Sequence, residues 1–173
     1  MTDPKSLYNE SDLAALGFAV TQAASLENAL RASVVFSNTG ANYGQRFTLS
    51  DHHEFRHVYT ELGLPKLIQL VNEKLPESSI SDSDKEFLSS LLIGENGSKD
   101  CFYIYWRNLL CHAPMMPRPD GSFDFRFYDR DVFKTLSGPE PSEGAVTSSD
   151  LRELAHKFGK AALIIATEFY PRP

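Results

Sequence analysis

The chain has 173 residues, 42% of them hydrophobic, and a formal net charge of −6. This length and apolar content can build one compact domain over residues 1–173, whose core needs neither a metal nor a disulfide. The net negative charge argues against indiscriminate binding to nucleic acid. No apolar run approaches the roughly 18 residues of a membrane span, and the polar N-terminus does not resemble a signal peptide. We therefore expect a soluble, cytoplasmic protein without membrane partners.

Hydrophobic periodicity predicts four helices in the first part of the chain. A loop over residues 37–47 separates the first two, and Ser50 or Asp51 begins the second helix. The third begins at Pro65, whose fixed φ suits a first helical position. The predicted helices cover about 11–35, 50–62, 65–75 and 83–93.

A fifth helix is predicted over residues 99–112, because Pro114 and Pro117 follow it and stop its continuation. Apolar side chains at helical spacing give this helix a face that we expect in the core. That face consists of Phe102, Trp106, Leu109, Leu110 and Ala113.

After this helix the pattern alternates between apolar and polar residues over 122–128, which predicts a short strand that can pair with 131–134. A loop over 137–147 then leads to a last helix, which Asp150 and Glu153 begin at capping-box spacing. Its expected core residues are Leu151, Leu154, Phe158, Leu163, Ile164 and Phe169. The predicted class is all-α, an up-and-down bundle of about five to six helices with a short β-strand or hairpin insert between the last two long helices.

The two cysteines, Cys101 and Cys111, would lie roughly 15 Å apart on one straight helix, which is too far for a disulfide. We expect two reduced thiols that serve packing. Glycine-rich phosphate loops, Cys-x-x-Cys pairs and Gly-x-Ser-x-Gly elbows do not occur in the sequence, and no cofactor is expected.

The segment Arg107-Asn108-Leu109-Leu110-Cys111-His112 places a permanent cation, an amide and an imidazole at the end of the fifth helix. Arginine can stabilise the extra negative charge of a phosphoryl transition state, and histidine can transfer the proton that phosphodiester cleavage requires. On one helix Arg107 and His112 point about 140° apart, whereas Asn108 and His112 share a face. The long arginine, a frayed helix end or a second copy of the chain must therefore bring the two groups together, and a symmetric dimer through this helix would do so.

Basic residues are concentrated in the same region, where residues 107–134 carry five cationic side chains against four aspartates. A surface that faces phosphate should therefore be local to this stretch, and Arg118 and Arg126 are its candidate substrate-binding residues. Tyr103 or Tyr128 could stack an unpaired base from an edge position. Glu27 in the first helix either supports Arg107 or forms an independent salt bridge.

An Arg-Asn-x-x-x-His pattern at the end of a late helix in a small helical domain resembles the HEPN superfamily, with Arg107, Asn108 and His112 in the three motif positions. Two further segments are similar to such chains, Leu26-Glu27-Asn28-Ala29-Leu30 and Leu62-Gly63-Leu64-Pro65-Lys66-Leu67-Ile68. The insert at 118–134 departs from the simplest bundle.

This resemblance implies a dimeric, metal-independent endoribonuclease of the toxin, phage-defence or RNA-processing type. Arg107, Asn108 and His112 would be catalytic, and the products would carry a 2′,3′-cyclic phosphate and a 5′-hydroxyl. The implied partners are RNA, a second copy bound through the motif helix, and an antitoxin or defence-system protein. Because many relatives lack catalysis, the alternative is a noncatalytic HEPN-like dimer that binds RNA or a protein.

A zinc hydrolase is a third hypothesis, because His53-Glu54-Phe55-Arg56-His57 matches the pattern His-Glu-x-x-His. The cation of Arg56 would lie beside the metal, and the preceding sequence predicts a helix where zinc proteases place a sheet. Glu61, Glu73 and Glu77 are the available third ligands, without a feature that selects one of them.

Overall fold

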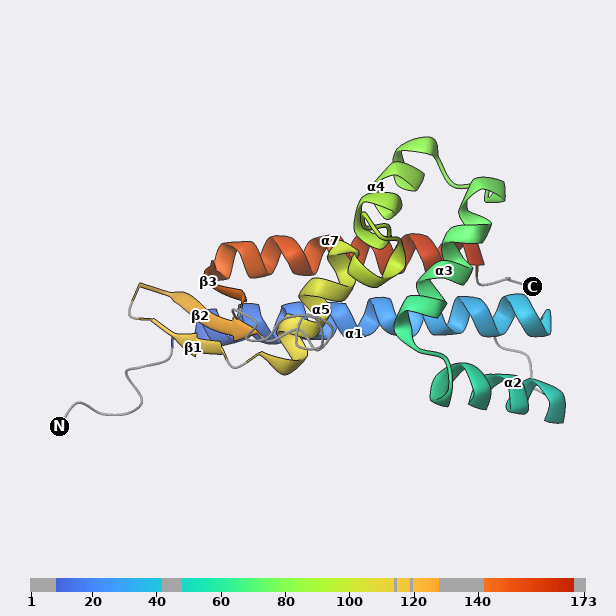
Figure 1. Ribbon diagram of the computed structural model, residues 1–173, viewed down its shortest axis with the longest axis horizontal. Helices are drawn as coiled ribbons and strands as arrows, with labels where there is room; N and C mark the ends of the chain where they lie inside the picture. Colours follow the sequence, from blue (N-terminus) through green and yellow to red (C-terminus); the bar gives the residue numbers. More distant parts are fainter. Residues whose placement is uncertain (1–8, 42–47, 114, 119, 128–141, 170–173) are drawn as a thin grey trace. The chain divides into compact units, whose positions relative to one another are not determined.

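The computed structural model describes residues 9–41, 48–113, 115–118, 120–127 and 142–169. These ranges contain six α-helices and one three-stranded sheet (Figure 1). The expected all-α helical bundle with a short β insert between the last two long helices is confirmed. The α-helices are α1 (Glu10–Thr39), α2 (Leu49–Thr60), α3 (Leu64–Lys74), α4 (Asp82–Leu92), α5 (Phe102–His112) and α7 (Ser148–Phe169).

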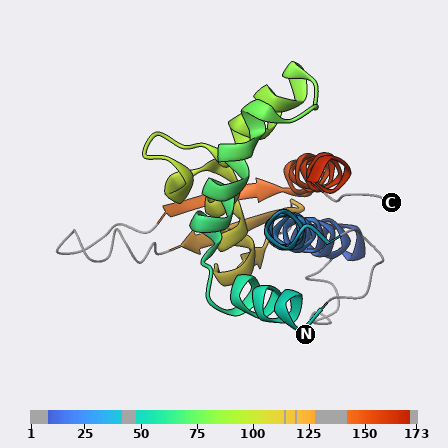
Figure 2. The ribbon, with the colours of Figure 1, turned by 90° about the vertical axis from the view of Figure 1, so that its right-hand side faces the viewer.

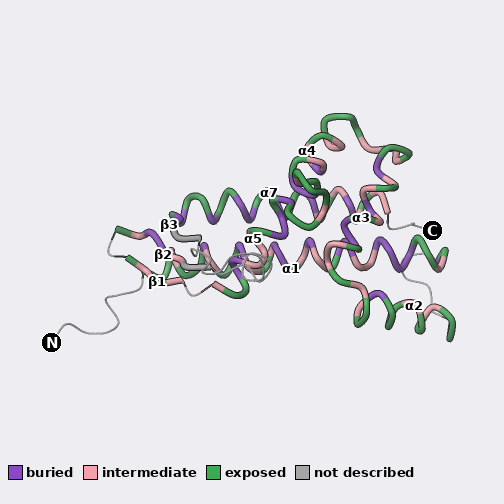
Figure 3. The backbone as a smooth tube through the Cα atoms, viewed as in Figure 1, coloured by how far each residue is buried: buried purple, intermediate pink, exposed green. Residues whose placement is uncertain are grey.

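The chain forms two compact units, and α1, α5 and α7 contribute residues to both. The first unit consists of Met1–Thr21 and Trp106–His156. The second consists of Gln22–Tyr105 and Lys157–Pro173. Each unit has its own buried core (Figure 3).

The core of the second unit forms between amphipathic helices, whose buried side chains recur three or four residues apart. The second half of α1 and the end of α7 lie side by side (Figure 2). The side chain of Gln22 in α1 packs against Gly159 in α7, where an added Cβ would lie 2.7 Å from the Gln22 Oε1 atom. The large, fully buried side chains of this unit are Leu26, Leu30, Leu67, Ile68, Leu88, Leu92, Tyr103, Phe158 and Ile165.

Arg31 joins α1 to the C-terminal end of α2 within the second unit. Its Nη1 atom donates hydrogen bonds to the carbonyl oxygens of Val58 at 2.7 Å and Leu62 at 3.3 Å. Its Nη2 atom lies 2.8 Å from Oε1 of Glu27, and the two side chains are 14% and 18% exposed. A cation at a helix C-terminus is favourable because carbonyl oxygens there lack helical partners. Arg31 thus satisfies polar groups that packing would leave unpaired.

Threonines cap two of the helices, which corrects the predicted helix starts. Thr48 caps α2 in a capping box with Asp51, so α2 does not begin at Ser50 or Asp51 as expected. Thr147 precedes α7, and its hydroxyl accepts a hydrogen bond from the amide of Asp150 at 3.1 Å. The Asp150 carboxylate in turn accepts from the Thr147 amide at 2.9 Å. The predicted capping role of Asp150 with Glu153 is therefore wrong, since Asp150 is the third helical residue of a box that Thr147 begins.

The first unit contains the antiparallel sheet, in the order β1 (Met115–Pro117), β2 (Ser122–Phe127) and β3 (Ser142–Thr147). The strand predicted over 122–128 is confirmed for residues 122–127, while residues 128 and 131–134 lie outside the described ranges. Strand β3 corrects the loop expected over 137–147. It forms because Val146 pairs with Phe123 of β2, and both side chains are buried.

Polar contacts fix the start of α7 in the first unit. The buried Ser148 hydroxyl donates to the carboxylate of Asp12 in α1 and lies 3.3 Å from the carbonyl oxygen of Gly121. Gly121 has a φ of +81°, which favours glycine, and ends the turn between β1 and β2. Arg152 also donates to the hydroxyl of Ser11 at 2.7 Å. These contacts connect α1, the β1–β2 turn and α7.

Candidate functional site

The motif residues lie in the last two turns of α5, which ends at His112 as predicted. The helix begins later than the expected residue 99, because Ser98–Asp100 form a 3-10 turn and Cys101 is extended. The carbonyl of Cys101 accepts the first helical bond, from the amide of Tyr105 at 3.2 Å. Beyond His112 the chain enters β1, so the imidazole stands at a junction between helix and sheet.

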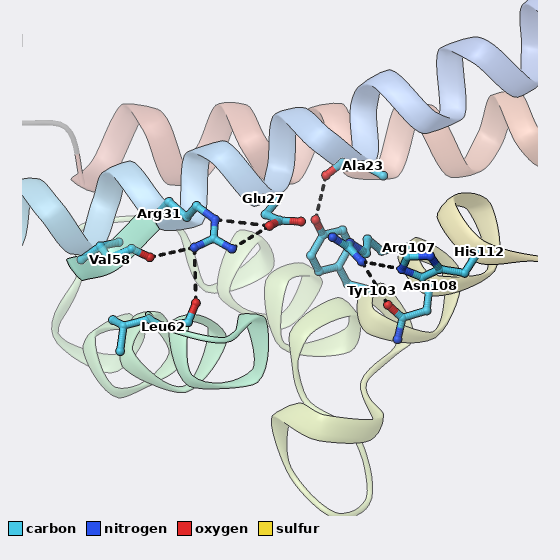
Figure 4. Close-up of polar contacts among 9 residues, drawn as sticks. All are labelled: Ala23, Glu27, Arg31, Val58, Leu62, Tyr103, Arg107, Asn108 and His112. Carbon is cyan, nitrogen blue, oxygen red and sulfur yellow. Dashed lines mark hydrogen bonds and ion pairs between the residues drawn. The ribbon is translucent and has the colours of Figure 1, made fainter. Parts of the chain in front are cut away.

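The three candidate catalytic residues converge within one chain (Figure 4). The Nη1 atom of Arg107 lies 3.3 Å from the Nε2 atom of His112 and 3.3 Å from the Oδ1 atom of Asn108. Arg107 and Asn108 are partly exposed and His112 is exposed. A cation, an amide and an imidazole therefore form one solvent-accessible cluster.

Arg107 and His112 meet on a single helix. Their Cα–Cβ bonds point about 140° apart, but the long and flexible arginine side chain spans this separation. Of the three ways that the sequence left open, the length of the arginine is the one observed. The geometry therefore does not require a second copy of the chain to bring the two groups together.

The direction of this contact follows from the chemistry of its two groups. Guanidinium nitrogens carry hydrogens and cannot accept a hydrogen bond, so Nε2 of His112 must be the acceptor. A neutral imidazole with an unprotonated Nε2 is the form that can remove a proton from a substrate.

The structure distinguishes the four residues that the sequence suggested for contacts with a substrate. Arg118 is exposed, but its guanidinium forms an ion pair with Asp124 at 2.5 Å. The hydrogen bond and charge of Asp124 raise the pKa of Arg118. Arg126 belongs to β2, and its side chain lies outside the described part of the structure. Tyr128, proposed from the sequence for base stacking, also lies outside the described residues.

The base-stacking role expected of Tyr103 is wrong, because its ring is fully buried in the second unit. Its hydroxyl donates a hydrogen bond to the carbonyl oxygen of Ala23 at 2.7 Å, and its ring packs edge-on against Phe158. A buried ring of this kind cannot stack an unpaired base. The expected core position of Phe102 is also wrong, since Phe102 is 36% exposed and lies 5.9 Å from the ammonium of Lys157.

The residues of the zinc hypothesis lie on α2 and have other partners. Glu54 accepts a hydrogen bond from the Nδ2 atom of Asn38 at 2.7 Å, and His57 contacts Glu61 at 2.8 Å. His53 is exposed. Among the residues that the structure describes, no three His, Cys, Asp or Glu side chains gather in an arrangement that could hold a metal ion.

The two cysteines are free thiols in different environments. Cys101 is buried, as expected of a packing residue, and burial raises its pKa. Cys111 is exposed next to His112, so the packing role expected for it is wrong. Glu27 forms the salt bridge with Arg31 described above.

Asp124 is a residue that the sequence pattern did not single out, although its carboxylate forms the ion pair with the guanidinium of Arg118. The signal was present in the strand register. Met116 pairs with Asp124 across β1 and β2, so Arg118, two residues further along, is a diagonal neighbour of Asp124 on the same face. The register itself could not be read without the structure, because the pattern did not reveal strand β1.

Comparisons with models of protein families, with curated proteins and with solved structures gave no match. In the described ranges, none of the helices combines the length and apolarity that a membrane crossing requires.

Proposed function

We propose that the chain is a metal-independent endoribonuclease of the HEPN type, in which Arg107, Asn108 and His112 act together. The contact between Arg107 and His112 carries the proposal, because a guanidinium, a group suited to binding phosphate, lies beside an imidazole there. Both groups reach solvent at the end of α5. These are the two kinds of group that cleavage of RNA needs when no metal takes part.

Substrate binding begins when a phosphodiester takes the place of His112 on Arg107. In the free chain one Nη1 atom is shared between two acceptors at 3.3 Å. Hydrogen bonds from a guanidinium to phosphate are shorter, about 2.7–2.9 Å, and often bidentate. The exchange is therefore favourable. It leaves Nε2 of His112 free beside the bound phosphate, while Asn108 continues to orient the guanidinium.

The reaction is an attack within the RNA strand. The ribose 2′-oxygen bonds to the adjacent phosphorus, and its proton moves to Nε2 of His112, which becomes an imidazolium. The bond from phosphorus to the 5′-oxygen breaks, and that oxygen takes a proton from water. Arg107 stabilises the negative charge on the phosphoryl oxygens during this step. The products are a 2′,3′-cyclic phosphate and a 5′-hydroxyl, and His112 returns its proton to solvent.

The resemblance of the sequence to the HEPN superfamily supplies the biological setting of the proposal. The enzyme would act in the cytoplasm in a toxin, phage-defence or RNA-processing system, under control of an antitoxin or another defence-system protein. It would form a homodimer through α5. Because the catalytic pair meets within one chain, such a dimer would organise the substrate and would not assemble the pair.

The test is incubation of the purified chain with single-stranded RNA in excess EDTA, followed by analysis of the product ends. The proposal expects cleavage with 2′,3′-cyclic phosphate and 5′-hydroxyl termini. Products with a 3′-hydroxyl and a 5′-phosphate would contradict the mechanism. RNA binding without any cleavage would favour the noncatalytic dimer instead.

A further inference from the structure

Helix α2 presents an exposed face that combines aromatic and basic side chains. On a helical wheel, Leu49, His52, Phe55, Arg56 and Tyr59 fall within about 120° of one another. We call these five residues the aromatic-basic face. Val58 is the buried residue of α2, and most of the remaining helix is exposed in Figure 3. Leu49 is 77% exposed and Phe55 is 40% exposed.

Two rings on this face already form a stack. The centroids of Phe55 and Tyr59 are 4.2 Å apart, and the ring planes differ by 17°. The guanidinium carbon of Arg31 lies 5.7 Å from the centroid of Tyr59 and supports that ring from α1. Because these two rings are already held in place and are partly exposed, stacking another planar group on them costs little conformational entropy.

The charges of α2 are separated between its sides. Asp51, Glu54 and Glu61 fall outside the arc of the aromatic-basic face, and Asp51 borders it about 40° from Phe55. Each carboxylate also has a local partner: the Thr48 amide at 2.6 Å, the Asn38 amide at 2.7 Å and the His57 imidazole at 2.8 Å, respectively. Arg56, by contrast, is exposed and falls on the aromatic-basic face. This face is therefore locally cationic although the chain carries a net charge of −6.

We infer that the aromatic-basic face of α2 binds an unpaired strand of RNA, with a base stacked on Phe55 and the adjacent phosphate on Arg56. Base stacking on aromatic rings combined with backbone contacts from arginine is how proteins bind single strands without reading a duplex. The choice of RNA as the nucleic acid rests on the proposed function. The binding chemistry rests on α2 alone.

The experiment measures fluorescence anisotropy of a short, labelled single strand of 2′-O-methyl RNA composed of A and C, which neither pairs with itself nor undergoes attack by a 2′-hydroxyl. We expect Phe55→Ala in the full chain to weaken binding about tenfold. Arg56→Gln should weaken binding and reduce the salt dependence by about one phosphate contact. Matched controls from the same unit are Ile93→Ala and Lys99→Gln, which remove an exposed apolar side chain and an exposed cation elsewhere.

Arg56→Gln removes no stacked ring, so its result stands even if Phe55→Ala weakens the fold. The inference is overturned if both variants bind like the unmodified chain, if duplex RNA competes as well as a single strand, or if the unmodified chain binds no RNA. Binding of a protein partner to this face, in a chain that does not bind RNA, also overturns the inference. Because the probe cannot be cleaved, intact binding in a chain that never cuts RNA would refute the proposed function alone. Cleavage that is insensitive to both α2 variants, with unchanged binding, would refute this inference alone.

Discussion

The guanidinium of Arg107 contacts the imidazole of His112 in the same chain, with Nη1 3.3 Å from Nε2. In this contact Nε2 of the imidazole is the acceptor, because guanidinium nitrogens only donate hydrogen bonds. The contact also makes the pair independent of a second chain.

Because the pair is assembled within one chain, two defective chains should not repair each other. We expect Arg107→Ala and His112→Ala each to lower RNA cleavage by at least about a hundredfold. Co-expressed chains carrying one change each, purified together through different tags, should remain as inactive as either variant. Recovery of cleavage in the mixed preparation would mean that Arg107 of one chain serves His112 of another.

The capping box at the start of α7 should make stability depend on pH. Hydrogen bonds from the Thr147 hydroxyl and backbone amide lower the pKa of Asp150 from its ordinary value of 3.8. A lowered folded-state pKa stabilises the fold above the unfolded pKa, and this contribution is lost as the pH falls through the lower folded value. Asp150→Asn should therefore lower the urea midpoint at pH 7, and the difference from the parent should shrink below about pH 4.

Thr147→Ala provides a comparison, since it removes the other half of the same box. It should cost about 1 kcal/mol at neutral pH. Urea titrations of both variants across the acid range measure these effects. If the gap between Asp150→Asn and the parent stays constant from neutral to acid pH, the ionised carboxylate is not the stabilising group.

The two thiols should differ strongly in reactivity. Cys111 is exposed, whereas Cys101 is buried and its pKa is raised by that burial, so the reactive thiolate of Cys101 is disfavoured. Brief alkylation of the folded chain should add one label, located at Cys111 by mass spectrometry. Cys111→Ser should remain unlabelled until the chain is unfolded. Rapid labelling of Cys101 in the folded Cys111→Ser chain would show that its surroundings open readily.

Helical periodicity revealed the helices more reliably than it assigned their faces. It predicted the end of α5 at His112, because the prolines that follow stop a helix locally. It placed Phe102 in the core, whereas Phe102 is exposed and the neighbouring Tyr103 is the buried residue. It also expected Leu163 in the core, where the side chain is 68% exposed. One residue rotates a helix face by about 100°, and the neighbours that decide the face are distant in sequence.

The missed details depend on partners that a local pattern does not contain. Strand β3 has little apolar alternation, and its pairing with β2 decides its structure. Polar residues surround both missed caps, so several could have served, and the hydrogen bonds of Thr48 and Thr147 select among them. The sequence proposed Arg107, Asn108 and His112 as candidates, but the backbone directions alone left open how the first and the last meet. The length of the Arg107 side chain is what allows the two groups to meet.

The central claim is that Arg107 and His112 cleave RNA together without a metal. Its most direct test is the rate of cleavage of a labelled single-stranded RNA in EDTA by the unmodified chain, Arg107→Ala and His112→Ala, with Lys99→Gln as a control. We expect cleavage by the unmodified chain and the control, and loss of at least about a hundredfold in each of the other two. Undiminished cleavage by folded His112→Ala protein would contradict the claim.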